Sequence, residues 1–225
     1  MGDLAVLLDG NNLSRLLVGL WVVARVALSS MALSVIIGLP VGMVMTLKNP
    51  ICRAACRVYL EIVRVMPQLV LLFLVYFGLT HASGVNLSGE TTAVIVFMFW
   101  GAAEIGDLTR GALSSIPSHQ YESGQALGLS KNSLYLSVIL PQAIRRLVPP
   151  AVNLATRMIK TTSLIALIGV ADVMKVAQQI IEGNRYLAPK AALWVYGGVF
   201  VLYFLVCWPV SKLAQMLERR RAADV

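Results

Sequence analysis

Long apolar segments dominate the sequence, and this feature limits the folds that the chain can adopt. Arg25 is the only charged side chain between residues 16 and 46. Over the whole chain 58% of the residues are hydrophobic and 13% are charged, and the mean hydropathy is +0.76. A soluble globular domain carries about 25% charged residues. We therefore expect a protein whose solvent is lipid.

The apolar segments are long enough to cross a bilayer. A spanning helix needs about 20 mostly apolar residues, because its backbone groups must bond within the segment. The sequence therefore predicts an all-α membrane protein with about five transmembrane helices in a single domain of residues 1–225. The expected spans are residues 15–46, 53–80, 91–114, 140–169 and 188–217, with kinks at Pro40, Pro149 and Pro150.

Basic residues lie in the connections that topology rules assign to the cytoplasm. They follow the first span, surround the connection 115–139 and end the chain, whereas residues 81–90 contain no Lys or Arg. This pattern predicts five spans, with the N-terminus outside and the C-terminus in the cytoplasm. These basic residues are Lys48, Arg53, Arg57, Lys131, Arg145, Arg146, Arg219, Arg220 and Arg221.

Several function classes find no support in the sequence. The net charge of +8 lies in topology-setting segments, so nucleic acid is not an expected partner. The cysteines and histidines show no metal-ligand spacing, and no Walker-type phosphate loop is present. We expect no catalytic residue, no metal and no cofactor in this chain. Asp3 and Asp9 precede any Lys or Arg, which argues against a cleavable signal peptide.

The polar connection 115–139 has the composition of a short exposed helix. Pro117 and Ser118 favour a helix start, and Gly128 favours a left-handed stop. Ser130 is typical of the cap of a following helix.

This connection resembles the cytoplasmic loop of the membrane subunits of ATP-binding-cassette (ABC) importers. That loop has Glu-Ala-Ala, then Gly six residues after the Glu, then Ile-x-Leu-Pro, and Glu122, Gly128, Leu140 and Pro141 keep this register. Ser123 and Gly124 replace the two alanines. In the family the helix sits in a groove on the ATPase. The resemblance implies an ATPase-coupling segment made of Glu122, Ser123, Gly124, Ala126, Leu127 and Gly128.

Other segments resemble the permeases that take up polar amino acids, the histidine, glutamine and arginine types. The resemblance implies the type I ABC importer permease fold with its cytoplasmic coupling helix, in a bacterial inner membrane. It also implies ATPase subunits that bind ATP and Mg²⁺, an external or periplasmic solute-binding protein, and a second permease that is either identical or similar. The matching segments are residues 61–68, 107–112, 141–143, 149–150 and 160–164.

Ionisable side chains recur every three residues in the predicted spans, which places each set on one helix face. Because charges are costly in lipid, we expect Glu61 to pair with Arg64 and Asp107 with Arg110. Arg25 stands alone in its span and is explained by snorkelling or by a partner from another helix.

Glu104 lies near the middle of its predicted span, without a deeper cation in the same helix. One hypothesis is that Glu104 lines a central cavity and attracts the amino group or a cationic side chain of the substrate. Thr161 and Thr162 would then supply hydrogen bonds. The alternative is a structural ion pair of Glu104 with Lys160 or Arg157. The cavity candidates are Glu104, Thr161, Thr162, Lys160, Glu61 and Arg64.

Two other function classes are alternatives to the importer. An ion channel or ion-coupled carrier would use Glu104 and Asp107 as ion ligands, but it has no need of an ATPase-docking helix. A membrane-embedded enzyme is disfavoured because no nucleophile-base or metal-ligand pair shares a span. For the substrate, Glu104 alone favours a cationic amino acid or a related cationic metabolite, and spacing does not identify the ligand.

Overall fold

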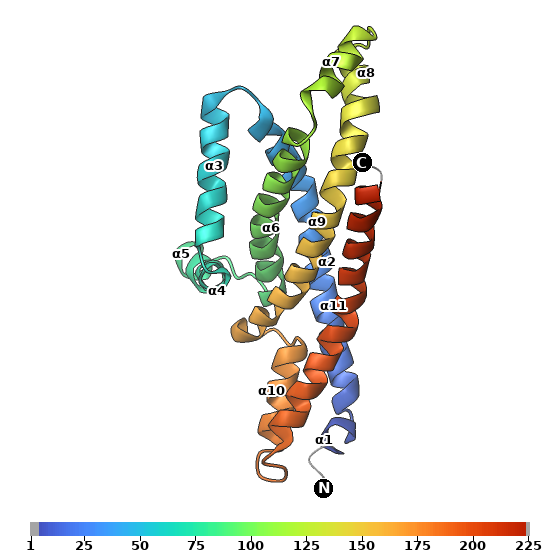
Figure 1. Cartoon of the computed structure of the whole chain (residues 1–225). Coiled ribbons are helices and arrows are strands. Elements are labelled where there is room, and N and C mark those ends of the chain that lie inside the picture. The colour runs from blue at the N-terminus through green and yellow to red at the C-terminus, as the bar shows by residue number, and fades with distance from the viewer. Residues whose placement is uncertain (1–4, 224–225) are drawn as a thin grey trace. The chain divides into compact units, whose positions relative to one another are not determined.

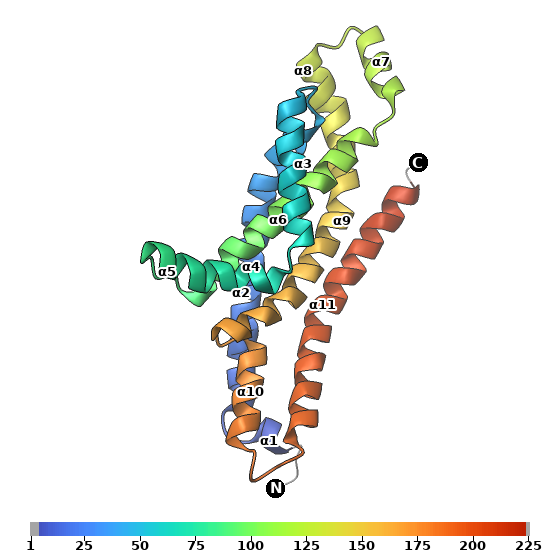
Figure 2. The same cartoon turned by 90° about the vertical axis from the view of Figure 1, so that its left-hand side faces the viewer.

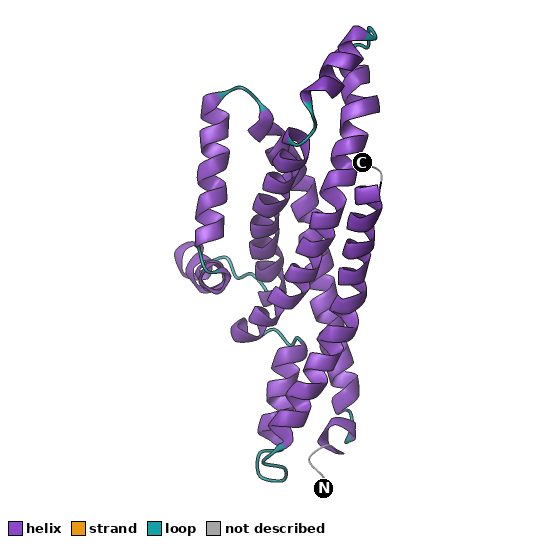
Figure 3. Ribbon diagram, viewed as in Figure 1, coloured by secondary structure: helices purple, strands orange, loops and turns teal. Residues whose placement is uncertain are grey.

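The structure, a computed structural model, describes residues 5–223, and every regular element in that range is a helix (Figure 3). Asp3 lies outside the described residues. The elements, labelled in Figure 1, are α1 (Ala5–Leu8), α2 (Asn12–Thr46), α3 (Pro50–Val65), α4 (Gln68–Phe73), η1 (Leu74–Leu79), α5 (Thr80–Ser83), α6 (Gly89–Ser114), α7 (Ser118–Ala126), α8 (Lys131–Leu134), η2 (Tyr135–Ile139), α9 (Leu140–Thr161), η3 (Thr162–Ile168), α10 (Val173–Gly183) and α11 (Ala191–Ala223).

The chain forms two compact units. Unit 1 contains Met1–Met31, Pro67–Phe97 and Thr156–Pro209, and unit 2 contains Ala32–Met66, Met98–Ala155 and Val210–Val225. The helices α2, α6, α9 and α11 contribute residues to both. That the whole chain is a single domain stays a prediction.

Four helical segments of the described chain are long and apolar enough to cross a membrane, which confirms four predicted spans. They are Asn12–Thr46, Gly89–Ser114, Lys131–Ile168 and Ala191–Arg219. The fifth, Pro50–Val65 with Gln68–Leu79, counts only if the pair is taken as one broken span.

The predicted unbroken helix 53–80 is wrong, because the helix ends before Pro67. Met66 has an extended backbone, with ψ 129°, as expected for a residue that precedes proline. Pro67 has no N–H to continue the helix, and α4 begins after it. Pro40, Pro149 and Pro150, by contrast, lie inside helices.

Two connections contain more helix than their composition suggested. The fourth span begins at Lys131, not near residue 140, because α8 and η2 lead directly into α9. Residues 170–187 contain α10, which Asp172 caps by accepting a hydrogen bond from the N–H of Lys175 at 2.8 Å.

The core of unit 1 packs α10 against α2 and α11. Buried residues include Leu16 and Val23 of α2, Val176 of α10 and Val195 of α11. In both views α10 runs beside the first half of α11 (Figures 1 and 2). A Cβ on Gly19 would lie 2.7 Å from the backbone nitrogen of Val173, so only glycine allows α2 to approach α10 this closely.

In unit 2 the helices α2 and α6 touch through small residues. A Cβ on Gly38 would meet Ile105 at 2.6 Å, and one on Gly42 would meet the carbonyl of Gly106 at 2.4 Å. This Gly-x-x-x-Gly spacing permits backbone contact between membrane helices. On the other side of α6, the Tyr59 hydroxyl of α3 donates to the Phe99 carbonyl at 2.6 Å.

Candidate functional site

The part of the predicted connection that precedes the fourth span, residues 115–130, folds as the sequence predicted. The helix α7 begins at Ser118 after Pro117, and Gly128 ends the turn with a φ of +75°. Ser130 caps α8 by accepting a hydrogen bond from the N–H of Ser133 at 3.2 Å. The short exposed helix is therefore confirmed.

The base of α7 is fixed to the end of the span that follows. Gly124 is buried, and a Cβ there would lie 2.4 Å from a methyl group of Leu134. Gln142 donates to Gln120 at 3.2 Å, and Arg146 donates to the Ser115 hydroxyl at 2.8 Å. Figures 1 and 2 show α7 beside α8 at the end of unit 2. A force applied to α7 would thus reach α9.

The outer surface of α7 is available to another protein. Leu127, the residue that follows the last turn of α7, is 81% exposed. Of the predicted coupling residues, Gly124 faces inward, whereas the exposed ones are Glu122, Ser123, Ala126, Leu127 and Gly128. Tyr121 packs near Tyr135, with ring centroids 6.0 Å apart, and burial raises the pKa of its phenol.

The charged residues of unit 2 pair across two helices. Arg64 of α3 lies 2.5 Å from Asp107 of α6, and Arg110 lies 2.6 Å from the same carboxylate. The predicted Asp107–Arg110 pair is confirmed. The predicted Glu61–Arg64 pair is wrong, because Arg64 reaches across to α6, to Asp107 and Glu104. Among the side chains that the structure describes, no ion pair engages Glu61.

Glu104 also meets Arg64, at 3.5 Å, and its side chain is 14% exposed. The sequence reasoning missed this partner because it considered cations in the same helix and on the fourth span. Lys160 and Arg157 belong to unit 1, so their pairing with Glu104 stays a prediction. Glu61 and Arg64 line a cavity of about 570 Å³ that does not include Glu104.

The other cavity candidates lie where α9 passes into η3. The Thr162 side chain is fully buried, and its hydroxyl donates to the Ile159 carbonyl at 2.7 Å. The Thr161 hydroxyl donates to the Arg157 carbonyl at 2.9 Å. Lys160 is exposed. Such hydroxyl bonds to a preceding turn are common in helices, and a role in binding substrate stays a prediction.

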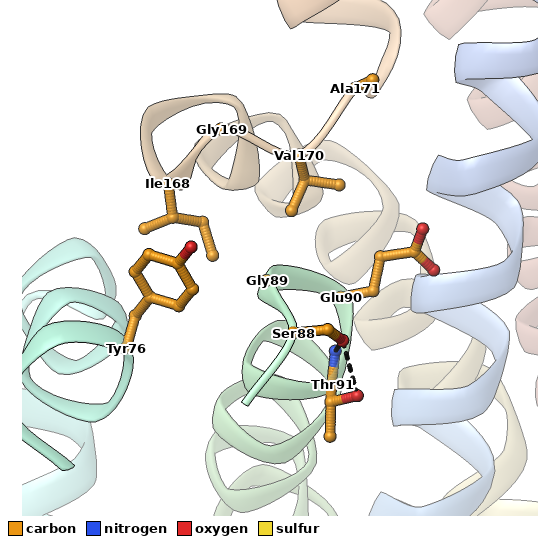
Figure 4. Close-up of a pocket in the computed structure, with 9 residues that line it drawn as sticks. All are labelled: Tyr76, Ser88, Gly89, Glu90, Thr91, Ile168, Gly169, Val170 and Ala171. Carbon is orange, nitrogen blue, oxygen red and sulfur yellow. Dashed lines mark hydrogen bonds between the residues drawn. The ribbon is translucent and has the colours of Figure 1, made fainter. Parts of the chain in front are cut away.

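Unit 1 contains a polar cavity of about 510 Å³ that the sequence did not reveal (Figure 4). Ser88 caps α6 at its edge by accepting a hydrogen bond from the N–H of Thr91 at 3.1 Å. The Glu90 side chain points away from Tyr76 and meets Arg25 of α2 at 2.5 Å. Of the two alternatives for Arg25, snorkelling or a partner from another helix, the structure shows the partner. The lining is completed by Gly89 and residues 168–171.

The chain matches known proteins over most of its length. Residues 38–222 match the family described as binding-protein-dependent transport system inner membrane component. The glutamine transport system permease protein GlnP of Escherichia coli (strain K12) is 35% identical over 196 residues, 87% of each chain. The probable amino-acid ABC transporter permease protein YckA of Bacillus subtilis (strain 168) is 32% identical over 84% of this chain and 79% of its own.

Solved structures share the fold. A crystal structure of an amino acid ABC transporter with histidines superposes with a TM-score of 0.81 at 25% identity, covering 92% of this chain and 94% of that one. An inward-facing MetNI methionine ABC transporter reaches 0.68 at 20% identity, over 91% and 97%. None of these relatives is an ion channel. The chain therefore belongs to the binding-protein-dependent transport system inner membrane components, as a multi-pass ABC importer permease of the amino-acid group.

Proposed function

We propose that this permease moves a polar amino acid into the cell by alternating access, driven by a separate ATPase that binds ATP and Mg²⁺. An external solute-binding protein delivers the substrate, and a second permease, identical or similar, completes the pathway. The relatives named for glutamine and amino-acid transport support the substrate class. The basic segments support an N-terminus outside and a C-terminus in the cytoplasm.

The observation that best supports this mechanism is that α7 exposes one side to solvent while its other side is held to the fourth span. Leu127 and Glu122 face solvent, while Gly124 and the Arg146–Ser115 bond hold the helix to the fourth span. A binding partner that grips α7 can move that span without unfolding it. The ATPase docks here, and nucleotide-driven closure reaches the pathway through α8, η2 and α9.

The ion pairing of Glu104 bears on the choice of substrate. A lone buried carboxylate would favour a cationic substrate, but Arg64 at 3.5 Å offsets part of its charge. We therefore place a zwitterionic polar amino acid such as glutamine first. A cationic amino acid is the second candidate, because Glu104 keeps a side chain that is not fully buried. Thr161, Thr162 and Lys160 remain candidate contacts for either substrate.

The test is uptake into vesicles that contain the permease, its ATPase and the cognate binding protein. We expect ATP-dependent uptake of glutamine to exceed that of arginine. Substituting Glu104→Gln should lower uptake at least tenfold, because a hydrogen bond to a charged group contributes about 1.5–3 kcal/mol. Arg64 keeps Asp107 as a partner in this variant, so assembly should survive.

Glu182→Gln is the matched control, since Glu182 is a carboxylate of α10 with 76% of its side chain exposed. It should transport at the wild-type rate. Unchanged uptake by an assembled Glu104→Gln complex would remove Glu104 from the substrate site. Flux that does not require ATP would contradict the importer and support the channel.

A further inference from the structure

The cavity of unit 2 lies where three helices end. It is lined by Met45 and Thr46 at the last turn of α2, by Arg53 near the start of α3 and by Ser114, the last residue of α6. Helix ends that gather in this way mark the boundary between hydrocarbon and water. Under the proposed orientation, on which this inference rests, that boundary is the cytoplasmic one.

The lining of this cavity carries more positive than negative charge. Four arginines face two carboxylates, and these six residues are Arg53, Arg57, Arg64, Arg110, Glu61 and Asp107. Arg64 and Arg110 both pair with Asp107, and Arg64 also meets Glu104, which does not line the cavity. Two carboxylates thus balance these two arginines, and the positive excess comes from the remaining arginines.

Arg53 and Arg57 supply that excess. They stand four residues apart on α3, which puts both on one helix face. Within the part of the chain whose side chains are described, no side chain forms a hydrogen bond or ion pair with either of these two. Two guanidinium groups, each able to bind phosphate oxygens through two N–H bonds, are thus available in the cavity lining.

The rest of α3 fits a lipid at this position. An adjoining face of α3 exposes Ile51 (77%), Val58 (56%) and Val65 (81%), a surface suited to acyl chains. The cavity of about 570 Å³ has the volume of a small-molecule site. Basic pockets between membrane helices on the cytoplasmic side bind the headgroups of anionic lipids.

We propose that Arg53 and Arg57 form an anion site for a phosphate group at the cytoplasmic end of unit 2. The headgroup of an anionic phospholipid such as phosphatidylglycerol supplies this group, and free phosphate is the other source of the same chemistry. The site differs from the substrate pathway proposed above, because Glu104 does not line it.

The test is lipid retention by the full-length permease in its complex, measured by native mass spectrometry with phosphatidylglycerol and with phosphatidylcholine. We expect phosphatidylglycerol to remain bound, and R53Q/R57Q to weaken its binding roughly 30-fold, since each arginine near the headgroup contributes a factor of about five. R53K/R57K keeps the positive charge but loses the paired N–H groups of guanidinium. Its affinity for phosphatidylglycerol should therefore lie between those of the wild type and R53Q/R57Q.

The matched control is K48Q/R145Q, which removes two exposed basic residues outside the cavity lining. It should bind lipid as the wild type does. Inorganic phosphate, titrated at constant ionic strength, separates the sources: tight phosphate binding that R53Q/R57Q abolishes, without a lipid preference, would make free phosphate the ligand.

If R53Q/R57Q and K48Q/R145Q retained phosphatidylglycerol equally and also bound inorganic phosphate equally, the proposed anion site would be wrong. Lipid is scored on the permease itself, in preparations that are monodisperse by size-exclusion chromatography. Loss of the ATPase from the complex would count against the proposed function alone and would leave the anion site to be decided by the lipid measurement.

Discussion

Each unit contains one aspartate that is at least half-buried, and the two carboxylates have different hydrogen-bond and ion-pair partners. Asp107 of unit 2 lies between two guanidinium groups, Arg64 and Arg110. Asp172 of unit 1 is fully buried. One of its oxygens caps α10, and the other has no hydrogen-bond partner among the described residues.

The difference is that cations compensate the charge of the half-buried Asp107, whereas the fully buried Asp172 lies in no ion pair among the described side chains. Asp107 needs its charge to hold two arginines from different helices. Burial raises the pKa of Asp172 to about 6, against the backbone hydrogen bonds at the helix start, which lower it. Asp172 lies between the fourth and fifth spans, where a cap is needed but a charge is not. The same substitution, aspartate to asparagine, should therefore have opposite effects at the two positions.

The largest effect is expected for Asp107→Asn. The change removes the shared carboxylate of two arginines and should lower the free energy of unfolding by about 3 kcal/mol, the low end for a broken buried pair because these side chains are partly exposed. Thermal unfolding of the purified protein in detergent measures it. Glu182→Gln, which disrupts one exposed contact at 3.7 Å, is the control and should shift stability by less than about 0.5 kcal/mol. An equal change in the free energy of unfolding of both variants would show that Asp107 contributes no more to stability than an exposed surface contact does.

Asp172→Asn should stabilise the protein at neutral and alkaline pH. The folded state binds the Asp172 proton more tightly than the unfolded state, so the stability of the wild type falls as the pH rises from about 4 to about 6. Asparagine keeps the cap and removes this penalty. At pH 8 the variant should gain at most about 3 kcal/mol, since one pKa unit corresponds to about 1.4 kcal/mol.

Unfolding midpoints of this variant and the wild type at pH 4 and pH 8 provide the check. The difference between the two proteins should be small at pH 4, where Asp172 is neutral in the folded state and about half ionised in the unfolded state. A constant difference across this range, or a loss of stability at pH 8, would mean that Asp172 is charged and compensated in the folded protein.

The smallest effect is expected for the Arg25–Glu90 pair, a carboxylate with one cation. Its side chains are 50% and 38% exposed, so solvent screens the interaction. A double-mutant cycle of Arg25→Gln and Glu90→Gln should give a coupling of about 0.5–1 kcal/mol. A coupling free energy above about 2 kcal/mol would mean that this exposed pair contributes as much to stability as the contacts of Asp107.

The parts of the fold that the sequence predicted correctly depend on local chemistry. Pro117, Gly128 and Ser130 define the ends of α7 and α8 through backbone preferences that act within a few residues. The Asp107–Arg110 pair follows from spacing on one helix. These features require no knowledge of packing.

The features that were missed depend on contacts between distant residues. Arg64 and Asp107 are 43 residues apart in the chain, and no spacing rule joins them. The break at Pro67 was hidden because the apolar segment continues through it. Two signals were present but unused: the cap residue Asp172 ahead of the apolar positions of α10, and the Gly38–Gly42 spacing that brings α2 against α6.

The central claim is that another protein grips α7, and Leu127 provides its most direct test. Leu127→Asp places a charge on the proposed interface, whereas Leu187→Asp changes an almost equally exposed leucine, 79% against 81%, in the loop after α10. The measurement is the amount of ATPase subunit that co-purifies with each variant. We predict at least a 30-fold weaker association for Leu127→Asp, as expected for an interface hot spot, and an unchanged association for Leu187→Asp. Full retention of the ATPase by a folded Leu127→Asp permease would contradict the account.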